Sequence, residues 1–198
     1  MSDGKSVSRS RRQARQVAFQ ALYMVSVGRA DIGRAFEVAS ERVPLSEDVS
    51  KFCHHLVDGV TKSKRGLDEQ IAPFLAQGWT IERLTFSDLI VLRMATYELF
   101  HFPGIPPKVT ISQAVELAKS FGTKESGSFV NGVLGNLLQA TPKANWDPSQ
   151  EEVFEDDDDS LIEPDAEIEE VEEDSEPEQE PEPEAEEKVN SWVLKSEE

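Results

Sequence analysis

The chain has 198 residues and a formal net charge of −19 at pH 7, which taken alone argues against binding to nucleic acid. The charge is unevenly divided, because residues 1–144 hold 18 Lys and Arg against 14 Asp and Glu, whereas residues 145–198 hold 2 against 25. A single cysteine, Cys53, excludes an internal disulfide framework, and the hydropathy pattern contains no signal peptide or membrane span. We therefore expect one compact, mildly basic domain in a reducing cytoplasm.

The periodicity of apolar residues predicts that this domain is all-α, with about seven helices. The first helix is expected over residues 8–28, where apolar positions recur at helical spacing. Asp31 is suited to cap a second helix, and Ser46 a third that ends before the polar run 61–66. A short fourth helix follows and is expected to bend or end at Pro73.

The second half of the domain contains the clearest helix breaker, at residues 102–107, which include three prolines and a glycine. Before it, Thr80 is expected to cap a longer helix with one apolar side. After it, Thr110 and Gln113 match a capping box, and Gly122 is expected to end that helix in a left-handed conformation. A final helix with an apolar face completes the domain.

Three regions follow from composition and charge. Residues 1–8 are expected to be a flexible basic N-terminus, residues 9–141 a helical domain, and residues 142–198 a disordered acidic tail. The tail is mostly Glu, Asp and Pro, and it cannot bury enough apolar surface to offset the entropy cost of ordering. Near its end, the run 189–195 contains Trp192 and three aliphatic residues, and either forms a docking peptide or is a chance apolar cluster.

No catalytic or cofactor motif emerges from the sequence. Cys53, His54 and His55 are adjacent on a predicted helix, where neighbouring side chains point about 100° apart and do not converge on one metal ion. Residues 122–132 contain Gly and Ser but lack the spacing and the Gly-Lys-Ser ending of a phosphate-binding loop. We therefore expect no metal, no cofactor and no enzymatic activity.

The first helix has a second face of interest. Five basic residues precede its apolar stripe: Lys5, Arg9, Arg11, Arg12 and Arg15. A helical projection places Arg12 and Arg15 on the same side as Phe19 and Tyr23, away from the apolar stripe. This basic-aromatic face either binds RNA or a protein partner, or it is a solvated basic terminus followed by two aromatic residues that cover another helix.

Four blocks of sequence, in this order, resemble the NusB family of transcription antitermination factors. They are Arg-Arg-Gln-Ala-Arg running into Ala-Phe-Gln-Ala-Leu-Tyr (11–23), Val-Leu-Arg-Met-Ala-Thr-Tyr-Glu-Leu (91–99), residues 109–122, and Phe-Val-Asn-Gly-Val-Leu (129–134). The resemblance implies two packed helical subdomains and a non-enzymatic role. It also implies pairing with NusE, a small-subunit ribosomal protein, to bind boxA RNA in ribosomal RNA leaders, so that RNA polymerase, with other Nus factors, reads through terminators.

The resemblance also implies roles for individual residues. By position, the RNA contacts would be Arg11, Arg12, Arg15 and Phe129, and the NusE contacts would be Tyr23 and Asp88. An exposed Phe129 could stack on an unpaired base, although its helix position is also compatible with a core residue. Ser128 departs from the family, which often has a basic residue before this aromatic, and the acidic tail lies outside the family pattern.

The tail leaves further interpretations open. It could recruit basic ribosomal or transcription proteins, which would make the protein an interaction adaptor. It could also compete with RNA for the arginines of the first helix, since both are polyanions, or it could serve solubility alone. A related helical domain precedes a methyltransferase domain in some ribosomal RNA methylases, but the acidic composition of residues 142–198 is not expected to form such a domain, which argues against that enzyme.

Overall fold

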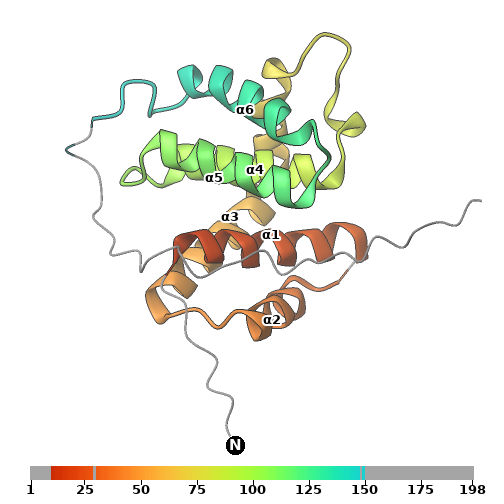
Figure 1. The fold of residues 1–198 in the computed structure, drawn as a ribbon, viewed down its shortest axis with the longest axis vertical. Helices are drawn as coiled ribbons and strands as arrows, with labels where there is room; N and C mark the ends of the chain where they lie inside the picture. Colours follow the sequence, from red (N-terminus) through yellow and green to blue (C-terminus); the bar gives the residue numbers. More distant parts are fainter. Residues whose placement is uncertain (1–9, 29, 148, 150–198) are drawn as a thin grey trace, which may run out of the picture. The chain divides into compact units, whose positions relative to one another are not determined.

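The computed structural model describes residues 10–28, 30–147 and 149, and within them it confirms an all-α fold (Figure 1). The described residues form six α-helices rather than about seven: α1 Arg11–Gly28, α2 Ile32–Arg42, α3 Glu47–Ile71, α4 Phe86–His101, α5 Pro107–Phe121 and α6 Ser126–Leu137. Three short 3-10 helices join or extend them: η1 Ala72–Phe74, η2 Ile81–Arg83 and η3 Leu138–Ala140.

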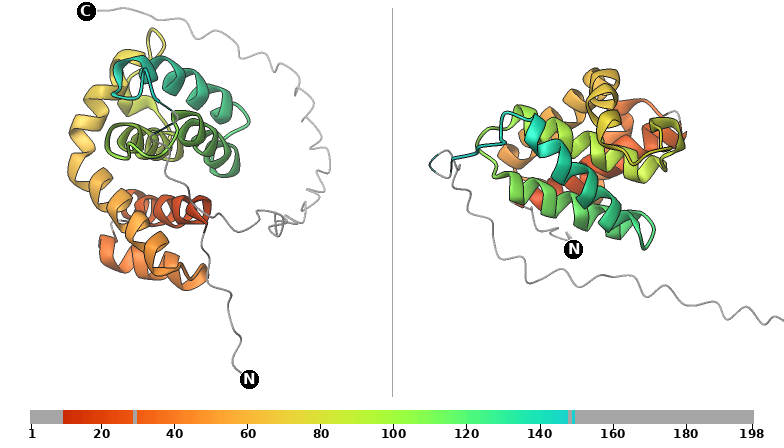
Figure 2. Two further views of the ribbon diagram at one scale, coloured as in Figure 1. Left: turned by 90° about the vertical axis from the view of Figure 1, so that its left-hand side faces the viewer. Right: turned by 90° about the horizontal axis from the view of Figure 1, so that it is seen from above.

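The helices form two groups that share the long helix α3. Helices α1 and α2 pack together at one end of α3, while α4, α5 and α6 pack together toward its other end (Figures 1 and 2). Contacts of α1 with both α3 and α4 join the two groups. This arrangement confirms the expectation of two packed helical subdomains.

Helix α4 is the central helix of the domain. Every residue from Asp88 to Leu99 is buried, because α4 contacts α1, α3, α5 and α6. The expectation of a helix with one apolar side, capped by Thr80, was wrong. Thr80 precedes the 3-10 helix η2, and α4 is capped instead by Thr85, whose hydroxyl accepts a hydrogen bond from the backbone N–H of Asp88.

Helix α3 is one continuous helix of 25 residues, where the sequence predicted two. The polar run 61–66 does not interrupt it. Val60 before the run and Leu67 after it are both buried, so the run occupies mostly solvent-facing turns of the same helix. The expected end near Pro73 is confirmed, because α3 gives way to η1 at Ala72.

Some local end signals are confirmed and others are wrong. Asp31 caps α2 by accepting hydrogen bonds from the backbone N–H groups of Gly33 and Arg34. The capping box at Thr110 does not form, because α5 already begins at Pro107, a residue favoured in the first turn. Gly122 ends α5 in an extended conformation (φ −109°) rather than a left-handed one.

The described chain beyond residue 141 keeps contact with the helices. Lys143 is buried and donates from Nζ to the carbonyl oxygen of Ile105, and Trp146 donates from Nε1 to the carbonyl oxygen of Pro103 at 3.2 Å. Lys143 and Trp146, which the sequence analysis placed in the tail, thus contact the helical domain. The predicted flexible N-terminus, the disordered tail and the 189–195 run lie outside the described residues.

Across these described ranges, no helix is both long enough and apolar enough to cross a membrane.

Candidate nucleic-acid interface

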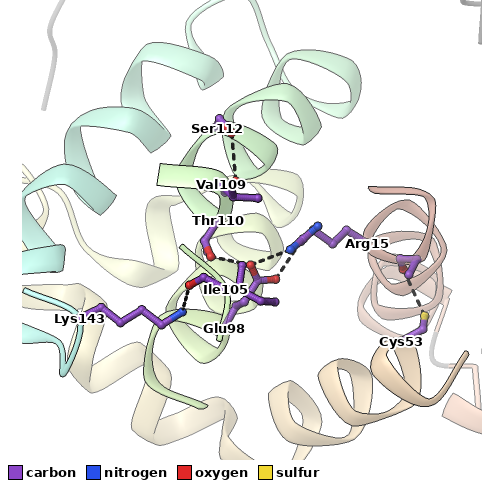
Figure 3. A network of polar contacts seen from close by, with 9 residues as sticks. Arg15, Cys53, Glu98, Ile105, Val109, Thr110, Ser112 and Lys143 are labelled. Atoms are coloured by element: carbon purple, nitrogen blue, oxygen red, sulfur yellow. Dashed lines mark hydrogen bonds and ion pairs between the residues drawn. The ribbon is translucent and has the colours of Figure 1, made fainter. Parts of the chain in front are cut away.

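Arg15, predicted to contact RNA, lies inside the domain. It is 5 % exposed, and its guanidinium makes two hydrogen bonds of 2.8 Å to the carboxylate of Glu98 on α4 (Figure 3). The same carboxylate accepts a hydrogen bond from the hydroxyl of Thr110 on α5. Charge-assisted, two-point pairing of this kind holds both side chains in one geometry. Arg15 thus fastens α1 to α4 and α5.

The two arginines before it lie at the start of α1 and are half-buried. The guanidinium carbon of Arg11 lies 4.9 Å from the ring centroid of Phe52 on α3, within the range of a cation–π contact. Arg12 is likewise partly accessible. Lys5 and Arg9, the other members of the basic cluster, lie outside the described residues. The first turn of α1 therefore presents two partly accessible arginine residues on a helix that Arg15 fixes in place.

Phe19 is a core residue, so the predicted basic-aromatic face does not exist as a continuous exposed surface. Its ring stacks on Phe121 of α5 with centroids 4.4 Å apart, and it is 3 % exposed. The alternative, in which this aromatic covers another helix, is correct for Phe19. Tyr23, one turn later, is 41 % exposed and lies 5.9 Å from the Phe19 ring.

Tyr23 borders an apolar groove of about 480 Å³ between α1, α2 and α5. Its lining residues are Phe19, Gln20, Tyr23, Met24, Val38, Ala39, Arg42 and Phe121. An open groove with an aromatic side chain and one basic residue, Arg42, at its border has the character of a surface that binds a peptide or protein segment. The sequence predicted a partner contact at Tyr23 but not the groove, because the groove forms only when α2 and α5 pack beside α1.

Asp88, the second residue predicted to face a partner, lies in the first turn of α4. It is 8 % exposed, and its Oδ1 atom is buried without a hydrogen-bond partner among the described residues. The N-terminus of a helix favours a negative charge, which accounts for a carboxylate at this position. Phe86, two residues earlier, is 57 % exposed, so the same turn also presents an apolar side chain to solvent.

Phe129 is half-buried in the second turn of α6 and has a neighbour that the sequence reading missed. The ring of Trp79, which is 49 % exposed, lies with its centroid 6.1 Å from that of Phe129. The guanidinium carbon of Arg83 lies 5.6 Å from the Trp79 ring centroid. The available signal was a tryptophan beside Gly78, a residue typical of turns. The sequence analysis placed a helix start at Thr80 and gave Trp79 no role.

Cys53 and its two histidine neighbours diverge. The Cys53 thiol is buried against the carbonyl oxygen of Ala14, and burial raises the pKa of the thiol to about 12, so it stays protonated. The His54 ring packs on Phe36 and the His55 ring on Phe102. Within the described part of the chain, no three His, Cys, Asp or Glu side chains are grouped so as to hold a metal ion.

Comparison with known proteins identifies the family. The model of the NusB family matches residues 12–139. The transcription antitermination protein NusB of Pelotomaculum thermopropionicum is 40 % identical over 131 residues, which cover 66 % of this chain and 90 % of that protein. The NusB protein of Lacticaseibacillus paracasei is 38 % identical over 136 residues, which cover 68 % and 98 %.

Solved structures agree with the sequence comparison. A structure of T. maritima NusB has a TM-score of 0.64 and 33 % identity, and the match covers 70 % of this chain and 97 % of that one. A structure of the antitermination factors NusB and NusE in complex with double-stranded RNA matches with a TM-score of 0.59 and 27 % identity, over 66 % and 96 %. The four sequence blocks, the two helical groups and these similarities together show that the chain belongs to the NusB family.

Proposed function

We propose that this protein is a transcription antitermination factor that binds boxA-type RNA together with NusE, in concert with other Nus factors and RNA polymerase. The observation that carries the proposal is the match to curated antitermination proteins over nearly their whole length, joined to a solved relative that holds NusE and RNA. It acts by binding rather than by catalysis, in the bacterial cytoplasm. Its buried, protonated Cys53 thiol is unsuited to serve as a nucleophile.

The RNA contacts that we propose are Arg11 and Arg12 at the start of α1, and Phe129 on α6. Guanidinium groups pair with phosphates, and a partly exposed ring offers a face for an unpaired base. Arg15 is not among the RNA contacts that we propose, since its Nε and Nη2 groups both donate to the carboxylate of Glu98. We assign it a positioning role, in which it holds the first turn of α1 in register with α4.

The NusE contacts that we propose are Tyr23, with the groove beside it, and Asp88. A partner side chain that fills the groove would bury apolar surface on both sides. A partner would reach Asp88 only through the small part of this residue that stays accessible, because its Oδ1 atom is buried. The groove therefore supplies most of the surface that we propose for NusE.

A titration of boxA-type RNA onto the protein, with and without NusE, tests this function. We expect Arg12→Ala and Phe129→Ala each to weaken RNA binding by the NusE complex about tenfold, since a phosphate contact or a stacked base contributes roughly 1 to 3 kcal/mol. The loss in Arg12→Ala should shrink as salt is raised. Arg65→Ala is the matched control, because Arg65 is an exposed arginine whose side chain is 94 % accessible on α3. Wild-type affinity in both variants would contradict the site.

The acidic tail makes a separate prediction. If it competes with RNA for the arginines of α1, a chain truncated at Pro148 binds RNA more tightly than the full chain at low salt. The difference should vanish near 0.5 M salt, where the screening length is only about 4 Å. Filter-binding measurements on both chains at several salt concentrations check this. Equal affinities of the two chains at low salt would contradict competition between tail and RNA. Solubility and partner recruitment would then be the remaining roles for the tail.

A further inference from the structure

Trp79 is a large aromatic residue that the fold holds at the surface beside Phe129. The two rings come from segments about fifty residues apart in the sequence, the turn before η2 and the second turn of α6. Their centroids are 6.1 Å apart and their planes are inclined by 37°. Trp79 is 49 % exposed, so a wide part of the indole stays open to solvent even with Phe129 beside it.

The turn that carries Trp79 is fixed by its own hydrogen bonds. Gly78 adopts φ +84°, a left-handed conformation that glycine tolerates at little cost, and the backbone N–H of Trp79 donates to the carbonyl oxygen of Ala76 at 2.9 Å. Arg83 donates from Nη1 to the carbonyl oxygen of Gly78 at 2.7 Å, while its guanidinium lies over the indole. The ring is thus presented by an ordered turn, which lowers the entropy lost when a ligand stacks on it.

We propose that Trp79 and Phe129 together form a stacking site for two successive unpaired bases of the RNA, with Arg83 directed at the adjoining phosphate. This inference rests on the RNA-binding function proposed above and extends its site beyond Phe129. Aromatic platforms for single-stranded RNA place rings at the spacing of neighbouring nucleotides and add cationic side chains for the backbone. Here two rings and one guanidinium occur in a single cluster.

The charges around this cluster indicate that stacking contributes more than charge does. Glu82 is next to Arg83 and fully exposed, and its own backbone N–H and the Thr80 hydroxyl hold the pKa of its carboxyl below the ordinary value, so it remains ionised. The positive charge of Arg83 and the negative charge of Glu82 therefore largely offset each other as seen by a distant phosphate. The contribution of Trp79 to RNA binding should depend weakly on salt, in contrast to that of Arg12.

Trp79 can report on its own contact. The chain has three tryptophans, so the Trp146→Phe/Trp192→Phe variant leaves Trp79 as its single tryptophan. We expect boxA-type single-stranded RNA, added to the complex of this variant with NusE, to quench the Trp79 fluorescence in proportion to the fraction bound. The same titration on a variant that also carries Trp79→Phe gives the background from NusE and is subtracted. Fluorescence anisotropy of labelled RNA measures binding independently.

Substitutions separate stacking from a merely structural role. We expect Trp79→Ala to lower the RNA affinity of the complex about tenfold, at low and at high salt alike, and Trp79→Phe to retain most of it because a ring remains. Trp146→Phe is the matched control, since Trp146 contacts Pro103 in another part of the domain. Pull-down of NusE by each variant is expected to be unchanged.

Three results would overturn the inference. If RNA binds the complex with normal affinity while Trp79 fluorescence and the Trp79→Ala affinity stay unchanged, the stacking site is absent and the proposed function stands. If Trp79→Ala impairs NusE capture but not RNA binding, the surface is a protein contact. If the wild-type complex binds no boxA-type RNA at all, the proposed function falls, and this inference with it.

Discussion

Replacement of Glu98 by alanine is expected to lower the free energy of unfolding by about 3 to 5 kcal/mol, the cost of leaving one member of a buried ion pair alone. Arg15 and Glu98 have side-chain exposures of 6 % and 2 %, so water cannot readily replace the lost partner. The Thr110 hydroxyl loses its acceptor in the same step. Urea denaturation followed by far-ultraviolet circular dichroism measures the change.

The matched control is Glu69→Ala. Glu69 pairs with Arg65 one turn away on α3, at side-chain exposures of 68 % and 94 %, and such surface pairs contribute less than about 1 kcal/mol. The triple variant Arg15→Leu/Glu98→Leu/Thr110→Val removes all three polar partners together and should recover most of the loss. A Glu98→Ala variant as stable as Glu69→Ala would show that the buried pair does not fasten α1.

This pair also connects stability to function. Arg11 and Arg12 lie one turn before Arg15, so their position depends on the anchorage of that turn. We therefore expect Glu98→Ala to weaken RNA binding without removing any RNA contact. The positioning role that we assign to Arg15 requires this indirect loss.

Replacement of Gly59 by alanine is expected to destabilise the protein by about 3 kcal/mol, at the upper end of the usual range for overpacking. An added Cβ on α3 would overlap the ring of Tyr97 on α4. That ring has little room to move, because it is 7 % exposed and lies among the rings of His55, His101 and Phe102. Thermal unfolding by calorimetry measures the effect.

Gly66→Ala on the same helix is the control for helix propensity. A Cβ at Gly66 meets no atom within 4 Å, so this variant should be more stable by about 0.5 to 1 kcal/mol. Adding Tyr97→Leu to Gly59→Ala should restore part of the lost stability by removing the overlapping atoms. If Gly59→Ala and Gly66→Ala shift the unfolding temperature in the same direction, close packing of α3 on α4 is not the cause.

Several elements could be predicted because their signals are local. Asp31 caps α2 through its own neighbours, and the three prolines and glycine of residues 102–107 end α4 whatever surrounds them. The predicted start of α5 was wrong, because a local pattern was overridden by a distant contact. Thr110 fits a capping box by spacing, but its hydroxyl donates to Glu98, twelve residues away, inside a helix that Pro107 had already begun.

The candidate site was also predictable only in part. Residue type and family resemblance single out Arg11, Arg12, Arg15, Phe129, Tyr23 and Asp88. They do not show that Arg15 turns inward, since that depends on an acceptor 83 residues away. Trp79 was missed for the same reason, because its nearness to Phe129 exists only once the turn before η2 lies beside α6.

The sequence by itself determined the helical class, the division of charge between domain and tail, and the family, because periodicity, composition and ordered motifs are properties of the chain alone. Only the tertiary structure decided which face of each helix is covered. It buried Phe19 beneath Phe121, enclosed α4 on all sides and left Trp79 exposed. The physical reason is that burial and ion pairing depend on neighbours brought together by packing, and a one-dimensional pattern does not specify those neighbours.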